Sequence, residues 1–292
     1  MTVPEAFIAV DWGTTNRRAY LIEGGQVVRS ERDAKGVTAL TAQDYPAEIA
    51  GLRDRLGDRP VLLAGMVGST IGWRPVPYVA APADLAALAG GCAWLDDRIA
   101  LIPGLSFRDG DQADVMRGEE VQLLGAAVAG LVPEDALLCQ PGTHCKWAQL
   151  KRGAIVRFTT AMTGELFALL RGHSVLAGQL GGTVTDGLAF RAGLVDGARR
   201  DLAASLFGVR ARSVLGLRDD ADAASYISAM LIGADVAARL DEAGDRIVHV
   251  VADPGLGALY AVAIDALGGR AVVVDSETAF IAGINRIREL VA

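Results

Sequence analysis

The chain has 292 residues, of which 51% are hydrophobic and 22% are charged, and 28 basic against 35 acidic residues give a formal charge of −7. This composition is typical of a folded chain with one large domain or two lobes, and it excludes a disordered or fibrous protein. The acidic balance argues against a nucleic-acid partner, because proteins that bind phosphate backbones carry a basic excess or a basic face.

No apolar stretch reaches the roughly 18 residues that a membrane helix needs, and no basic region precedes the first apolar run. We therefore expect neither a membrane span nor a secretory signal. The cysteines Cys92, Cys139 and Cys145 are odd in number and lack CxxC spacing, which argues against a disulfide framework or a thiolate zinc site. These features predict a cytoplasmic protein whose cysteines are small core residues.

The chain contains two copies of a strand, turn, strand, turn, strand pattern. The first copy spans Phe7–Ser30 and the second spans Ala136–Phe158. Aligning Gly13 with Gly142 places a Gly-Thr turn after the first strand of each copy and keeps the later strands and turns at the same spacing. Such a match is the signature of a duplicated unit, so we predict an α/β protein of two related lobes.

Helical periodicity predicts one helix between the two copies and further helices after the second copy. A helix is expected over Asp114–Val132, where apolar residues follow an acidic start. Further helices are expected over Ile227–Leu240 and Leu256–Leu267, and a last strand over Ala271–Val274 precedes a closing helix. The predicted lobes are residues 1–131 and 132–292, with the final helix 278–292 packing back towards the first lobe.

The first Gly-Thr turn has the residue types that bind a triphosphate. Asp11 ends a strand and is followed by Gly13, Thr14, Thr15 and Asn16. Glycine lets a phosphate approach the backbone, amides and hydroxyls donate to its oxygens, and the carboxylate can hold Mg²⁺. An ordinary hairpin turn uses the same residues, but the duplication favours the phosphate interpretation.

The second turn is similar but lacks the carboxylate. Gly142, Thr143, His144 and Lys146 lie at or beside this turn, and Gln140 stands where the first turn has an aspartate. Two such turns facing each other would hold a phosphate chain from both sides. The metal ligand is therefore expected from the first turn alone.

Several motifs together carry a resemblance to a known family. They are Ala9–Asn16, Ala64–Ser69, Gly72-Trp73 with Pro77-Tyr78, Val115–Glu120, Pro141–Trp147 and Met162–Phe167. The sequence resembles the 2-dehydro-3-deoxygalactonokinase family, within the superfamily of sugar kinases, heat-shock proteins and actin. The resemblance implies two ribonuclease H-like lobes with ATP in a central cleft.

The resemblance also implies an activity. It is the transfer of the γ-phosphoryl group of ATP, with Mg²⁺, to the C6 hydroxyl of 2-dehydro-3-deoxy-D-galactonate in galactonate breakdown. A kinase for another keto-deoxy acid or for a sugar is an alternative, because fold alone does not separate these substrates. A non-catalytic actin-like nucleotide-binding regulator is the other alternative. The carboxylates at the expected base position favour a kinase.

Related sugar kinases place a catalytic carboxylate at the N-terminus of a helix that lines the cleft. Asp111, Asp114, Glu119 and Glu120 lie near the start of the predicted linking helix. We rank Asp114 first and Glu119 second as the base that accepts the hydroxyl proton. A helix cap, or a favourable interaction with the helix dipole, is the alternative for each.

The substrate is an anion, so an enzyme of net charge −7 needs a local cation to hold it. Arginine suits a carboxylate because its planar guanidinium donates two hydrogen bonds side by side. Arg117 is the first candidate and Arg17 the second. The alternative for Arg117 is an ion pair with Glu119 or Glu120.

Other contacts are expected from matching family positions. Substrate residues are expected at Gly65, Ser69, Trp73, Tyr78, Thr163 and Glu165, and adenosine residues at Asp253 and Gly255. The aromatic residues suit packing equally well, and Thr163 suits a helix cap. Asp253-Pro254 departs from the commoner Gly-Ser or Gly-Thr form of the adenosine loop. The expected partner is a small sugar acid, and a homodimer is left open.

Overall fold

The computed structural model describes residues 6–217, 220–243 and 247–291. It divides into unit 1, which comprises Met1–Asp135, Ala148–Phe158 and Ser276–Ala292, and unit 2, which comprises Ala136–Trp147 and Thr159–Asp275. Unit 1 therefore gathers three separate stretches of chain and includes the final helix. That helix begins at Ser276, and the last residue of the predicted range, Ala292, lies outside the described residues.

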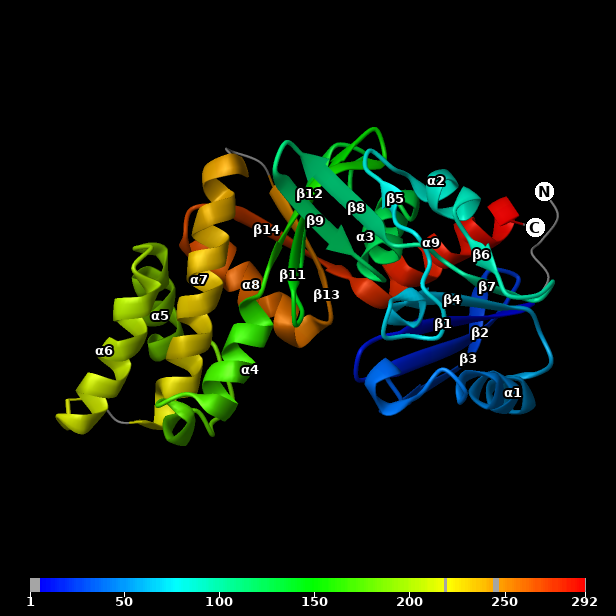
Figure 1. The fold of residues 1–292 in the computed structure, drawn as a ribbon. Coiled ribbons are helices and arrows are strands. Elements are labelled where there is room, and N and C mark those ends of the chain that lie inside the picture. Colours follow the sequence, from blue (N-terminus) through cyan, green and yellow to red (C-terminus); the bar gives the residue numbers. More distant parts are fainter. Residues whose placement is uncertain (1–5, 218–219, 244–246, 292) are drawn as a thin grey trace. The chain divides into compact units, whose positions relative to one another are not determined.

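A six-stranded sheet forms the centre of unit 1, in the order β3-β2-β1-β4-β7-β6 (Figure 1). Its strands are β1 (Phe7–Trp12), β2 (Arg17–Glu23), β3 (Gln26–Asp33), β4 (Val61–Gly65), β6 (Ala93–Trp94) and β7 (Ile99–Leu101). The first three strands pair antiparallel, as the hairpin pattern predicts, whereas β4 pairs parallel with both β1 and β7. The carboxyl ends of β1 and β4 therefore lie at the same edge of this sheet.

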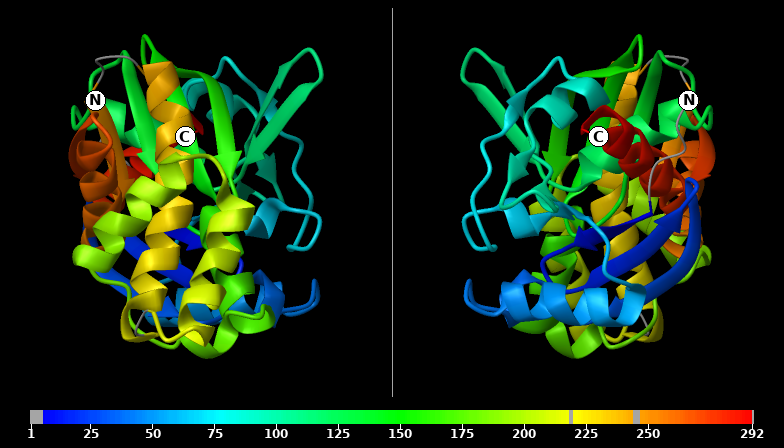
Figure 2. Two further views of the ribbon diagram at one scale, coloured as in Figure 1. Left: turned by 90° about the vertical axis from the view of Figure 1, so that its left-hand side faces the viewer. Right: turned by 90° about the vertical axis from the view of Figure 1, so that its right-hand side faces the viewer.

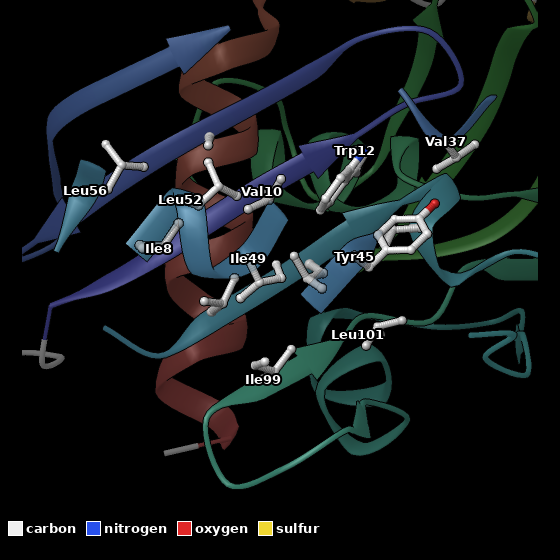
Figure 3. Packing of buried hydrophobic residues seen from close by; sticks show 14 of the residues in the cluster. Ile8, Val10, Trp12, Val37, Tyr45, Ile49, Leu52, Leu56, Ile99 and Leu101 are labelled. Carbon is white, nitrogen blue, oxygen red and sulfur yellow. The ribbon is translucent and has the colours of Figure 1, made fainter. Parts of the chain in front are cut away.

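Helix α1 (Tyr45–Leu56) covers one face of this sheet. Its buried Ile49, Leu52 and Leu56 belong to the same cluster as Ile8 and Val10 of β1 (Figure 3). The β1 residues at alternate positions point to this face, as the period of two in a strand requires. This packing fixes the strand that leads into the first Gly-Thr turn.

The predicted helix over Asp114–Val132 is wrong in its first part. Residues Gln112–Met116 form strand β9, which pairs antiparallel with β8 (Leu105–Asp109) beside the short β5 (Val79–Ala80). The Asp-Gly sequence at 109–110 turns the chain into a hairpin, which overrides the acidic pattern of a helix start. Helix α3 begins only at Glu119 and ends at Val128.

Helices α2 (Leu85–Gly90), α3 and α9 (Ser276–Val291) complete unit 1, and α3 packs closely against α9. A Cβ atom on Gly125 of α3 would overlap the carbonyl oxygen of Ala279, and one on Gly283 of α9 would overlap that of Val121. The two backbones approach each other at glycines, and this close contact joins the last segment of the chain to unit 1.

The second sheet repeats the strand arrangement of the first, with the order β12-β11-β10-β13-β14. Its strands are β10 (Ala136–Gln140), β11 (Cys145–Lys151), β12 (Ala154–Ala161), β13 (Ile247–Ala252) and β14 (Arg270–Asp275). As in the first sheet, the leading strand has consecutive strands of the chain on one side and a parallel strand on the other. The expected duplication is therefore present in the topology. The outer parts of β11 and β12 are grouped with unit 1.

The helices of unit 2 include those predicted from the sequence over Ile227–Leu240, which extends further at both ends, and over Leu256–Leu267, which begins two residues earlier and ends one residue earlier. They are α4 (Thr163–His173), α5 (Leu188–Ala198), α6 (Leu202–Val214), α7 (Ala223–Ala243) and α8 (Pro254–Ala266). Helices α5 and α7 lie side by side (Figure 2). The segment Ala223–Asp241 of α7 is long and apolar enough to cross a membrane, and 67% of it is buried within the protein. It serves here as a core helix.

Gly125→Ala should destabilise the protein by several kcal/mol, because the added methyl group would overlap the backbone of α9. Gly172→Ala is the matched control, since a Cβ at this helical position of α4 meets nothing within 4 Å. The control should stabilise the protein by about 0.5–1 kcal/mol through helix propensity. Urea unfolding of both variants measures the difference, and equal effects would contradict the described packing of α3 on α9.

Candidate active site

The first Gly-Thr turn, residues 13–16, connects β1 to β2 and is held from behind by a strap, which we define as residues 35–38. The carbonyl oxygens of Gly13, Thr14 and Thr15 each accept a hydrogen bond from a strap amide, at 3.0–3.2 Å. The Thr38 hydroxyl also donates to the carbonyl oxygen of Thr14 at 2.8 Å. Three consecutive carbonyl oxygens of the turn are thus directed towards the strap.

The opposite side of the turn is therefore rich in amide donors. In a trans peptide the N–H group points away from the carbonyl oxygen, so fixing one direction fixes the other. The amides of Thr14, Thr15 and Asn16 donate to no backbone oxygen of the described residues, and all three residues are exposed. Successive free amides in a tight turn form a concave anion site. The geometry fits phosphate oxygens.

Charged side chains secure the strap. The Trp12 indole N–H donates to the carbonyl oxygen of Lys35 at 2.7 Å, and the guanidinium of Arg17 lies over the Trp12 ring. Arg17 is 2% exposed and donates to Asp33 and to Glu48, with Nη1 2.9 Å from Glu48 Oε2. Burial opposes ionisation of Glu48, but hydrogen bonds from Lys35 and Arg17 hold its pKa below the ordinary value.

The prediction that Arg17 binds the substrate carboxylate is wrong, because its guanidinium is buried and already paired with Asp33 and Glu48. Arg17 instead supports the first turn. The strap itself was not predicted, and Gly36 shows why the sequence held no signal for it. A Cβ on Gly36 would overlap the backbone of Thr14 and Thr15, yet this close approach joins segments about 20 residues apart and has no local pattern.

The N-terminus of α3 lies beside Asp11. Gly118, which precedes the helix, has φ +109, a conformation that favours glycine. A Cβ at Gly118 would be 3.1 Å from the Cα of Gly65 and 4.0 Å from Asp11 Oδ1. The ends of β1 and β4 thus meet the start of α3, where Glu119 is the first helical residue.

This arrangement separates the two candidates for the base. Asp114 lies on β9, paired with Phe107 across the hairpin, so its predicted place at a helix start is wrong. Glu119 does stand at the start of α3, and its Oε2 accepts a hydrogen bond from the Arg117 amide at 3.0 Å. Of the two, only Glu119 stands at the start of α3.

Glu120 supports this corner from inside the protein. It is fully buried, and its two carboxyl oxygens accept from the Gly118 amide at 2.8 and 2.7 Å. Burial, together with repulsion from Glu119, raises the pKa of Glu120 to about 8. The sequence did not distinguish Glu120 from the three other carboxylates near the predicted helix start. Its burial depends on tertiary packing, which has no local pattern.

Arg117 is the predicted substrate residue that keeps free donors. It is 8% exposed, its Nη2 donates to the carbonyl oxygen of Val76 at 2.7 Å, and its guanidinium carbon lies 4.3 Å from the centre of the Tyr78 ring. Its Nε and Nη1 are buried and donate to no residue that the structure describes. An ion pair with a neighbouring glutamate would have used these donors.

The remaining predicted substrate residues of unit 1 have different surroundings. Gly65 adjoins Gly118, and Tyr78 is 41% exposed beneath Arg117. The Ser69 hydroxyl donates to the carbonyl oxygen of Met66 at 2.7 Å and so holds its own loop. Trp73 stacks on Tyr45 at 5.4 Å and packs against the core, which supports the packing interpretation for this residue.

In unit 2, helix α4 holds the second Gly-Thr turn. The Glu165 amide donates to the carbonyl oxygen of Thr143 at 2.9 Å, and the backbone of Gly164 lies against Gly142. His144 Nε2 is 2.5 Å from Glu165 Oε2, and both side chains are more than one third exposed. Predicted cofactor residues and a predicted substrate residue therefore form one cluster.

The other predicted site residues of unit 2 do not belong to this cluster of side chains. Lys146 is 4% exposed, and its Nζ donates to the Thr160 hydroxyl at 3.0 Å. The Thr163 hydroxyl donates to Asp235 rather than capping its helix. Asp253 and Gly255 are exposed at the N-terminus of α8, and their contact with adenosine stays a prediction.

Glu120→Gln should change how stability depends on pH. Below its raised pKa of about 8, the native carboxyl of Glu120 is protonated, whereas in the unfolded chain it ionises near its ordinary value of 4.5. Its contribution to the free energy of unfolding is complete below pH 4.5 and is lost as pH rises to 8, by at most about 1.4 kcal/mol per pH unit.

Glutamine does not titrate, so the variant should lack this loss and should gain stability relative to the wild type as pH rises. Urea unfolding between pH 5 and 8.5 checks this. Glu23→Gln, at an exposed position of β2, is the control and should follow the wild-type profile. Parallel curves for the wild type and Glu120→Gln would contradict the raised pKa.

The sequence and the fold are both similar to those of known proteins. The chain is 40% identical over 290 residues to 2-dehydro-3-deoxygalactonokinase of Escherichia coli strain K12, with 98% of each chain covered. A crystal structure from Sinorhizobium meliloti, described as a 2-dehydro-3-deoxygalactonokinase, superposes with a TM-score of 0.88 at 35% identity, covering 96% of this chain and 97% of that one.

A more distant structure shows the fold alone. The ADPNP-bound activator of 2-hydroxyisocaproyl-CoA dehydratase from Clostridium difficile has a TM-score of 0.53 at 12% identity, covering 97% of this chain and 94% of that one. The actin-like ATPase fold class that the sequence predicts is thereby confirmed. The family model of 2-keto-3-deoxy-galactonokinase matches residues 11–287. The chain belongs to the 2-keto-3-deoxy-galactonokinase family.

Proposed function

We propose that this protein transfers the γ-phosphoryl group of ATP to the C6 hydroxyl of 2-dehydro-3-deoxy-D-galactonate. The Escherichia coli relative named above is called 2-dehydro-3-deoxygalactonokinase, and the chain covers 98% of its length. The single structural observation that carries the proposal is that Nε and Nη1 of Arg117 are buried without acceptors among the described residues, two positions before the start of α3. The carboxylate of a sugar acid offers two charged acceptor oxygens that match a guanidinium side by side, whereas a neutral sugar offers only the weaker acceptors of its hydroxyl groups.

The first turn supports the use of ATP. Its free amides at residues 14–16 would bind phosphate oxygens, and the exposed Thr14 and Thr15 add hydroxyl donors. Among the described residues no group of three metal ligands occurs, so a cation would be held by Asp11 together with phosphate oxygens and water, as Mg²⁺ usually is. When bound, Mg²⁺ would offset the negative charge of the phosphates.

Glu119 is the proposed base. A primary hydroxyl becomes a stronger nucleophile as its proton passes to a carboxylate within hydrogen-bond reach. Glu119 lies next to the residues that hold the substrate carboxylate, because Arg117 is two positions before it and donates its amide to Glu119 Oε2. Arg117 would orient the acid at one end of the molecule, so that the hydroxyl at the other end meets the base.

The cytoplasmic location and the homodimer stay predictions.

Turnover with a panel of acceptors tests the proposal. ADP release should be strong with 2-dehydro-3-deoxy-D-galactonate, weaker with its gluconate epimer and absent with neutral hexoses. Preference for a neutral hexose would contradict the role given to Arg117. Preference for the epimer would retain the sugar-acid class and overturn the galactonate assignment.

Glu119→Gln should lower kcat by about 10²–10⁴-fold, the usual contribution of a general base, without a comparable change in either KM. Asp114→Asn, the matched control on β9, should keep kcat within about two-fold of the wild type. Steady-state kinetics of both variants decide between the two carboxylates. A large loss in Asp114→Asn with a mild effect in Glu119→Gln would reverse the assignment.

Arg117→Lys should raise the KM for the sugar acid by about 10–100-fold, because it removes the paired donors while keeping the charge. The KM for ATP should change little, since the phosphate turn is separate from this side chain. Arg98→Lys, at a surface ion pair with Asp58, is the control for a change of the same type. A rise in the KM for ATP alone would refute the carboxylate role of Arg117.

A further inference from the structure

A buried carboxylate on α7 joins the two segments that carry the second Gly-Thr turn. Asp235 is 9% exposed, and its Oδ1 accepts from the Trp147 indole N–H at 3.0 Å while its Oδ2 accepts from the Thr163 hydroxyl at 3.0 Å. Trp147 lies on β11, the strand that leaves the turn, and Thr163 is the first residue of α4. One side chain thus connects the turn's strand to the turn's supporting helix.

Both partners of Asp235 stand next to groups that contact the turn. Thr163 is followed by Gly164, whose backbone lies against Gly142, and by Glu165, whose amide donates to the carbonyl oxygen of Thr143. The space between α4 and the turn leaves no room for a Cβ at Gly164, so a small displacement of the helix start would move the turn.

The surroundings of Asp235 make this connection rigid. Both donors are buried, Trp147 at 3% and Thr163 at 6% exposure, so water does not compete for the carboxylate. Burial raises the pKa of Asp235, and the hydrogen bonds from Trp147 and Thr163 oppose this shift. A buried hydrogen-bonded network specifies one arrangement of the groups it joins.

We propose that Asp235 is a positioning residue for the nucleotide: through Trp147 and Thr163 it sets the second Gly-Thr turn against α4. The turn then presents its amides, and the His144–Glu165 pair beside them, to the phosphate chain. This inference rests on the proposed function, because it takes ATP as the ligand of the turn. No contact between Asp235 and the nucleotide is involved.

The test removes one hydrogen bond at a time and follows nucleotide binding. Thr163→Val keeps the shape of the side chain but loses the donor, and it should weaken ADP binding in calorimetry, and raise the KM for ATP, by about 5–20-fold. The loss of ADP affinity should appear in the absence of the sugar acid, so that it does not depend on any contact between Thr163 and the acceptor. Thr163→Ser restores the hydroxyl and should restore the affinity.

Two substitutions of Asp235 itself, one conservative and one that removes the side chain, extend the test. Asp235→Asn keeps an oxygen for Trp147 and can donate its amide to the Thr163 oxygen, so it should bind ADP nearly as well as the wild type. Asp235→Ala should match or exceed the loss in Thr163→Val, and combining the two changes should add little, because both remove the same connection. Full additivity of the two losses would overturn the shared role.

The control is a buried hydrogen bond elsewhere on the same helix. Tyr226 of α7 donates to Asp196 of α5, so Tyr226→Phe should lower the melting temperature and leave ADP affinity unchanged. An equal loss of affinity in Tyr226→Phe would reduce the effect of Asp235 to general stability and overturn the inference. If the wild type binds ADP and the folded Thr163→Val variant binds it equally well, the inference is overturned, whereas the proposed kinase function is not. Failure of the wild type to bind ADP would overturn the proposed function, and this inference with it.

Discussion

The anion site of unit 1 depends on three hydrogen bonds that direct the carbonyl oxygens of Gly13, Thr14 and Thr15 towards the strap at residues 35–38. Because the peptide units are planar, these bonds leave the amides of the turn on its exposed side. The ion pairs of Arg17 with Asp33 and Glu48 fix the strap in turn. The turn thus presents these amides before any ligand arrives, and little backbone reorganisation would be needed for an anion to bind there.

A buried cation lies near the start of α3 in an otherwise acidic chain. The chain is acidic as a whole, yet the guanidinium of Arg117 is buried beside Tyr78 with two atoms that lack acceptors. Unsatisfied buried donors are costly, and a substrate carboxylate would remove that cost on binding.

In unit 2 the network around Asp235 is fully hydrogen-bonded to its partners and serves a different purpose, which is to hold the second turn in place.

Local patterns in the sequence predicted the strands and Gly-Thr turns of both copies and the helices α7, α8 and α9, since these depend on periodicity and on turn residues that are neighbours in the chain. Helices α1, α2, α5 and α6 and strands β4 to β8 were not predicted. The helix start at Asp114 was wrong because the Asp-Gly turn at 109–110 and Gly118 divide that segment into a hairpin and a later helix. Arg17 was misassigned because its partners lie 16 and 31 residues away. The Asp235 network spans 72 and 88 residues and leaves no local signal. Tertiary contacts decide which charged residues are available to a ligand.

The central claim is that the exposed amides of the first turn bind the phosphates of ATP. A crystal structure of the protein with Mg²⁺ and a non-hydrolysable ATP analogue tests it most directly. The account predicts phosphate oxygens about 2.7–3.2 Å from the amide nitrogens of Thr14, Thr15 or Asn16, with the strap hydrogen bonds retained. Phosphates bound elsewhere while these amides face solvent would contradict it.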